Sequence, residues 1–89
     1  MATLSIFYGI IISMFYGDNK QHKLPHIHAQ YQNFEASFSI PDGKMMEGDL
    51  PTKKSKLVQA WIVLHEEDLM ANWELATNEK NIFKIDPLK

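Results

Sequence analysis

Two short runs of alternating apolar and polar residues follow one another in the middle of this sequence. The runs span residues 27–31 and 34–40, with two residues between them. In an extended chain, a period of two places every apolar residue of such a run on one face. If residues 32–33 form a two-residue turn, Tyr31 lies opposite Phe34 and the apolar faces of the two strands coincide. The pattern therefore predicts an antiparallel hairpin with one buried face and one polar face.

The residues before and after this hairpin predict further strands. An apolar run over residues 6–16 is rich in β-branched and aromatic side chains, and we interpret it as one buried strand. Within that run, Gly9 indicates a bulge or a close backbone contact. The turn signal at residues 41–44 predicts a third strand at about residues 45–49.

The C-terminal half has the period of helices. Pro51 suits a helix start, and Thr52 is a candidate cap. One helix over residues 52–77 would be about 39 Å long, which is too long for a domain of this size, so we expect a break near His65. Residues 66–68, all acidic, would then lie in the first turn of a second helix, where the dipole favours carboxylates. The apolar stripes of the two helices comprise Leu57, Val58, Trp61, Ile62, Leu64, Leu69, Met70, Trp73 and Ala76.

These elements predict one α+β domain that spans residues 1–89. We expect a two-layer fold, in which an antiparallel β-meander of three to four strands packs against two C-terminal helices. The β-meander half covers residues 1–50 and the helical half covers residues 51–78. Residues 79–89 form a tail or a short edge strand.

The composition excludes some functions and disfavours others. The chain has no Cys, which rules out disulfides, thiol catalysis and Cys-based zinc sites, and makes a reducing cytoplasm the expected compartment. All nine basic residues are Lys, so the bidentate contacts of Arg are missing, and a net charge of −2 further disfavours nucleic acid without excluding it. The longest apolar run falls well short of the roughly 20 residues that cross a bilayer. We therefore expect no signal peptide and no membrane association.

The strongest candidate site lies in the segment Leu24-Pro25-His26-Ile27-His28-Ala29. On a strand, His26 and His28 project side by side, away from the apolar face. Two neighbouring imidazoles can bind a metal ion, transfer a proton or contact a phosphate. The hairpin register makes Glu35 a diagonal neighbour of His28. His22 and Asp18, from the preceding loop, are further candidates for this cluster.

Several interpretations of these histidines stay open. His26 and His28 with a carboxylate such as Asp18 or Glu35 would suit a divalent zinc or iron ion. A metal-free acid–base or phosphate-contacting site is the second interpretation, and a merely solvated polar face is the third. His65 is expected at the helix junction, where it bonds a backbone carbonyl or caps the second helix. A direct catalytic role for His65 is the alternative.

Short motifs follow one another along nearly the whole chain: Phe7-Tyr8-Gly9-Ile10, Pro25-His26-Ile27-His28-Ala29, Phe34-Glu35-Ala36, Glu47-Gly48-Asp49-Leu50-Pro51, Trp61 with His65, Leu69 to Trp73-Glu74, and Lys84-Ile85-Asp86-Pro87-Leu88. Their order resembles a bacterial family, the "domain of unknown function 4160". The resemblance implies a small protein whose gene lies beside that of another small protein, as in a toxin–antitoxin pair. It brings no established catalytic residues. Relative to the family pattern, the segment from Asp18 to Pro25 is longer here, and Leu24 and Ile27 replace a Pro and a Phe.

These observations lead to two main classes of function. The first is a toxin-like effector that acts on RNA or a nucleotide, with His26, His28, Glu35 and His65 as candidate catalytic residues. The second is a non-catalytic module that binds a small partner protein encoded nearby, through an exposed sheet edge or the helix pair. A metal-binding protein that uses His26, His28 and Asp18 is a third class. An exposed strand would also allow a homodimer.

Overall fold

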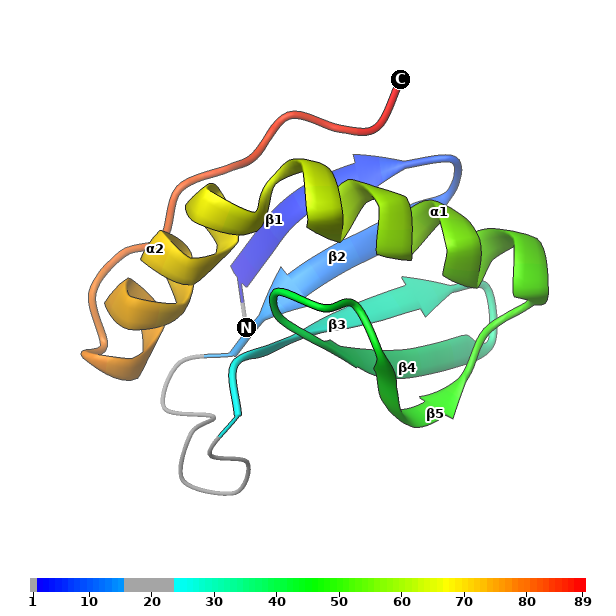
Figure 1. Ribbon diagram of the computed structural model, residues 1–89, viewed down its shortest axis with the longest axis horizontal. Helices are drawn as coiled ribbons and strands as arrows, with labels where there is room; N and C mark the ends of the chain where they lie inside the picture. Colours follow the sequence, from blue (N-terminus) through cyan, green and yellow to red (C-terminus); the bar gives the residue numbers. More distant parts are fainter. Residues whose placement is uncertain (1, 16–23) are drawn as a thin grey trace.

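The computed structural model describes residues 2–15 and 24–89, which form an antiparallel β-sheet with two helices over one face (Figure 1). Each strand pairs with its neighbour in the chain, in the order β1-β2-β3-β4-β5. The predicted α+β meander is confirmed, with five strands rather than three to four. Within the described residues, no helix has the length and apolar character needed to cross a membrane. The elements are β1 (Ala2–Phe7), β2 (Ile10–Met14), β3 (His26–Tyr31), β4 (Phe34–Ser39), β5 (Met45–Asp49), α1 (Thr52–Leu64) and α2 (Glu66–Thr77).

The additional strand comes from a hairpin that lies within the first apolar run. That run is not one strand, because Phe7 pairs with Ile10 across a two-residue turn. The turn residues Tyr8 and Gly9 have φ values of 51° and 76°. Two positive φ angles match the twist of the flanking strands, and Gly adopts such an angle at no steric cost. The interpretation of residues 6–16 as a single strand is therefore wrong.

The central hairpin has the register that the alternation predicts. Tyr31 pairs with Phe34, and His28 pairs with Ser37. The left-handed turn residue is Gln32, with a φ of 54°. This register places the apolar side chains of β3 and β4 on the face that the helices cover, and the polar ones on the opposite face, which we call the outer face.

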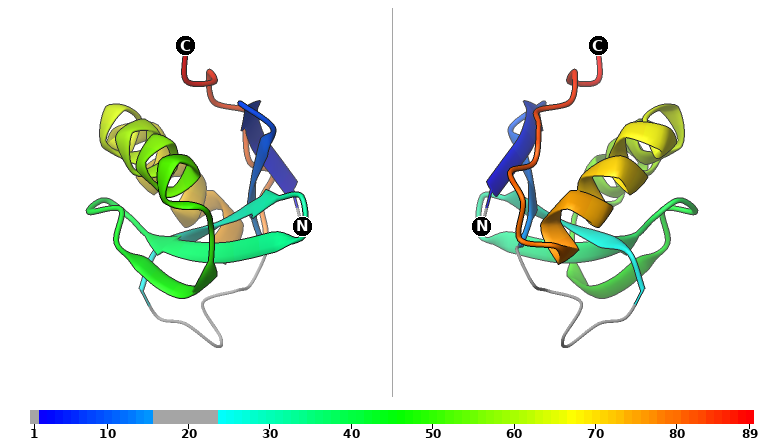
Figure 2. Two further views of the ribbon diagram at one scale, coloured as in Figure 1. Left: turned by 90° about the vertical axis from the view of Figure 1, so that its right-hand side faces the viewer. Right: turned by 90° about the vertical axis from the view of Figure 1, so that its left-hand side faces the viewer.

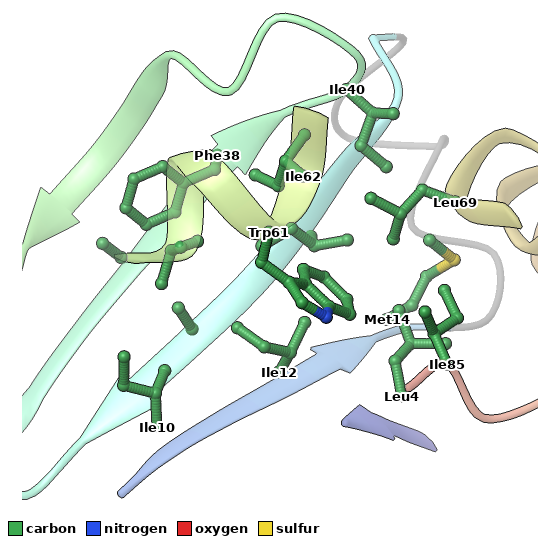
Figure 3. Close-up of a cluster of buried hydrophobic side chains, with 14 of the residues drawn as sticks. Leu4, Ile10, Ile12, Met14, Phe38, Ile40, Trp61, Ile62, Leu69 and Ile85 are labelled. Atoms are coloured by element: carbon green, nitrogen blue, oxygen red, sulfur yellow. The ribbon is translucent and has the colours of Figure 1, made fainter. Parts of the chain in front are cut away.

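The two helices lie in the hollow of a strongly bent sheet. Figure 2 shows β1 and β2 standing at a steep angle to β3, β4 and β5, with α1 between the two parts. The fully buried ring of Trp61 lies at the centre of this core (Figure 3). The predicted helix break is present at His65, whose backbone carbonyl accepts a bond from the Leu69 amide at 2.9 Å. Two members of the predicted stripes, Leu64 and Met70, are exposed, because these parts of the helices point to solvent.

The N-terminus of α1 differs from the prediction in one detail. Thr52 is the first residue of the helix rather than its cap, and Pro51 occupies the N-cap position. No side chain caps this end. Proline supplies a suitable backbone angle there, because it fixes φ and its missing amide costs no helical hydrogen bond.

The C-terminal tail runs along β1 and is fixed to the helices (Figure 2). The Ile85 amide donates to the Leu4 carbonyl at 2.9 Å. The buried side chain of Asn72 binds the backbone of Phe83 twice, as donor at 3.1 Å and as acceptor at 2.8 Å. The tail therefore covers the free side of β1, although it forms no regular strand.

Candidate functional site

The two histidines of β3 lie side by side, as the alternation predicts. The ring centroids of His26 and His28 are 5.1 Å apart, with the edge of one ring toward the other. Their strand neighbours Ile27 and Ala29 are fully buried on the helix side. The histidines therefore belong to the outer face of the sheet.

His26 differs from the expectation of a solvated side chain. It is only 1% exposed, and its ring lies 5.0 Å from the ring of Trp73 on α2. Its Nδ1 donates a hydrogen bond to the Leu24 carbonyl at 2.8 Å; a carbonyl can only accept, so Nδ1 carries the proton. Trp73 of α2 reaches the beginning of β3 and packs against the His26 ring there, a contact that the period of the strand alone could not show.

His28 is half-buried and reaches the surface. The ring of Phe15 stacks on it, with centroids 4.2 Å apart and an angle of 15° between the planes. His28 also belongs to a row of polar residues across four strands, since Ser13 pairs with His28, His28 with Ser37, and Ser37 with Glu47. The serines in this row are small and buried. The imidazole is therefore held among fixed neighbours on a rigid sheet.

A pocket of about 280 Å³ opens beside this row. We call it the His28 pocket. The carboxylates of Glu35 and Glu47 in its lining are exposed at the surface. An imidazole and a carboxylate in one pocket can serve as the acid and the base of a proton-transfer reaction. The pocket is lined by Phe15, His28, Glu35, Ala36, Ser37, Glu47 and Gly48.

The sequence predicted one of these carboxylates near His28 but not the other. Glu35 was predicted as a diagonal neighbour of His28, and it lines the same pocket. Glu47 was missed, although the strand that carries it was predicted. The pairing of β4 with β5 has an irregularity between Ser37 and Phe38, so alternation alone does not give the register.

His65 lies elsewhere in the molecule. It stands at the junction of α1 and α2, with its ring 5.5 Å from that of Trp61. The shallow pocket beside it is lined by residues 63–68, none of which lines the His28 pocket. The predicted position of His65 at the junction is confirmed, but its backbone rather than its side chain begins α2.

The predicted metal site cannot be placed as a whole. Asp18 and His22 lie outside the described residues. Within residues 2–15 and 24–89, no three His, Asp or Glu side chains come together as metal ligands. Because Nδ1 of His26 donates to the Leu24 carbonyl, that nitrogen carries a proton and does not coordinate a metal ion. A site of His26, His28 and Asp18 stays a prediction.

A family model described as a domain of unknown function (DUF4160) matches residues 9–74. The matched range includes every residue that lines the His28 pocket and ends within α2. No curated protein and no solved structure matches the chain.

Proposed function

We propose that this chain, which belongs to the domain of unknown function 4160 family, is a toxin-like effector that cleaves RNA by acid–base catalysis in the His28 pocket. One observation carries the proposal. His28 is half-buried against Phe15 and shares its pocket with the carboxylates of Glu35 and Glu47. An imidazole exchanges protons near neutral pH, and a neighbouring carboxylate can take the complementary role.

RNA supplies its own nucleophile, which suits a small and open site. In the proposed step, the 2′-hydroxyl oxygen forms a bond to phosphorus while the bond from phosphorus to the 5′ oxygen breaks. A carboxylate of Glu35 or Glu47 accepts the 2′-hydroxyl proton, and protonated His28 gives a proton to the departing 5′ oxygen. The products are a 2′,3′-cyclic phosphate and a free 5′-hydroxyl. This step uses only groups of the pocket and the substrate.

His26 has a different part in this proposal. Its ring is buried between Trp73 and His28, so it cannot touch a substrate at the surface. The bond from Nδ1 to the Leu24 carbonyl fixes the orientation of this ring. We therefore assign His26 as a positioning residue that supports His28.

The acidic lining favours a second candidate, a non-catalytic protein-binding module. Among the described residues, the pocket lining has two carboxylates and no Lys, and negative charge at the mouth weakens the binding of a polyanion. A cationic protein surface would be attracted instead. Such a module requires no turnover, so an RNA-cleavage assay distinguishes the two candidates.

The proposal predicts a large loss of activity in His28→Ala. We expect the purified, untagged protein to cleave a fluorogenic RNA oligonucleotide, and the variant to be slower by about 10²–10⁴-fold. Glu35→Gln and Glu47→Gln identify the partner carboxylate. Gln30→Ala is the matched control, because Gln30 is exposed on the same strand but does not line the pocket.

Two further arms of this assay test the chemistry. An oligonucleotide with a 2′-deoxy sugar at the cleaved position should resist cleavage, because it lacks the nucleophile. Chelation with EDTA should leave the rate unchanged. Equal rates for wild type and His28→Ala, or no cleavage at all, contradict the proposal. A rate that EDTA abolishes and zinc or iron restores would favour the metal site instead.

A further inference from the structure

We infer that the open edge of β5 is a docking site for an extended, basic segment of a partner protein. β5 is the last strand of the sheet, and within the described residues no strand pairs with its other side. Glu47, Gly48 and Asp49 are exposed along it. An unpaired edge presents backbone donors and acceptors that an extended segment can bind as an added strand. The edge shares Glu47 and Gly48 with the His28 pocket, but the inference does not require RNA cleavage.

The two edges of the sheet differ in what lies beside them. At the β1 edge, Ile85 of the tail is buried and bonds the Leu4 carbonyl. The bonds from Asn72 to Phe83 and from Trp61 to the Asp86 carbonyl fix this tail in place. No described segment covers β5 in this way. Within residues 2–15 and 24–89, the chain therefore covers the edge at β1 and leaves the edge at β5 open.

An apolar pocket adjoins the open edge. It has a volume of about 510 Å³, and we call it the Met pocket. Met45 and Met46 of β5 are half-buried beside it, and Leu24 is 63% exposed. Flexible thioether side chains adapt to different shapes, so this pocket suits a large apolar side chain of a partner. The lining residues are Leu24, Ser39, Ile40, Pro41, Asp42, Lys44, Met45 and Met46.

Charge determines which partner fits the rest of the edge. Glu47 and Asp49 are two residues apart on β5, and Asp49 pairs with Glu35 on β4. An added strand would pass these carboxylates at alternate positions, about 6.6 Å apart. Lys or Arg at alternate positions of the partner would complement them, together with one large apolar residue for the Met pocket. A second copy of β5 would bring carboxylates against carboxylates, so we expect a different protein rather than a homodimer.

The test begins with selection of random decapeptides on the intact, immobilised protein. Peptides that also bind a variant with both Asp49→Lys and Met46→Asp are discarded, because they bind elsewhere on the protein. The expected consensus has an apolar residue near one end and basic residues at alternate positions. The synthesised consensus peptide should shift backbone amide NMR signals of residues 45–49. Methylation of its backbone nitrogens should abolish binding, because the added strand needs those donors.

The single variants separate the contributions of charge and of the Met pocket. Asp49→Lys and Met46→Asp should each weaken the consensus peptide by about tenfold or more. Glu67→Lys is the control, because it makes the same change in net charge on α2, away from the edge. Neither Asp49 nor Met46 lines the His28 pocket, so RNA cleavage should persist in both variants. No consensus, a consensus without basic residues, or unchanged affinity in both variants would overturn the inference.

Discussion

Replacing Trp61 by Ala should lower the free energy of unfolding by about 3–5 kcal/mol. The side chain is fully buried, and its ring centroid lies 5.3 Å from that of Phe7. Its indole Nε1 donates to the Asp86 carbonyl at 2.8 Å, so the substitution also leaves an acceptor of the tail without this donor. The structure cannot close such a cavity without moving both the sheet and α1 (Figure 3). A small domain has only about 5–15 kcal/mol of stability in total.

Denaturant unfolding, followed by circular dichroism, measures this loss. Leu64→Ala is the control, since it removes a large apolar side chain from the same helix at a position that is 69% exposed. We expect the control to change stability by less than about 0.5 kcal/mol. A loss below about 1 kcal/mol for Trp61→Ala would show that this ring does not form the centre of the core.

The second large effect is expected for Gly48→Ala in β5. Gly48 has a φ of 87°, and an added Cβ would lie 2.2 Å from the Glu35 carbonyl oxygen and 2.8 Å from the Ala36 Cα. Both contacts are with backbone atoms of β4, so β5 would have to move away. The strained φ alone costs about 1–3 kcal/mol, and the close approach adds to that cost. Because Gly48 also lines the His28 pocket, RNA cleavage should fall as well.

Gly43→Ala provides the matched control for this close approach. Gly43 has a similar φ of 75°, but an added Cβ there would meet its nearest atom, the Gln59 Cα, at an ordinary 3.6 Å. Both variants therefore carry the backbone strain, and only Gly48→Ala forces two strands apart. Thermal unfolding should show the larger loss for Gly48→Ala. Equal losses would mean that β4 and β5 adjust freely at this position.

The parts of the fold that follow from local periods were predicted well. The register of β3 with β4 follows from alternation and a two-residue turn, and the break at His65 follows from helix length. The turn at Tyr8 and Gly9 was missed, because the residues on both sides of it are apolar and no polar residue marks the reversal. A continuous apolar run does not show where the chain reverses.

The candidate site was predicted only in part, because a local period determines some of its contacts but not others. His26 and His28 lie side by side because they are two residues apart on β3. Glu35 lies near His28 because β3 and β4 form one hairpin. The buried ring of His26 packs against Trp73 on α2, and the position of Glu47 at the pocket follows from the irregular pairing of β4 with β5. Those two facts come from packing between segments far apart in the sequence, which a period within one segment does not contain.

Growth of a bacterial host during induced expression tests most directly the claim that the His28 pocket is the functional site. Wild type, His28→Ala and Gln30→Ala are compared at equal protein abundance, measured by immunoblot. If the His28 pocket is the functional site, wild type and Gln30→Ala arrest growth with loss of cellular RNA, whereas cells that express His28→Ala grow normally. Growth arrest of equal strength by His28→Ala, or normal growth with the wild-type protein, would contradict this claim.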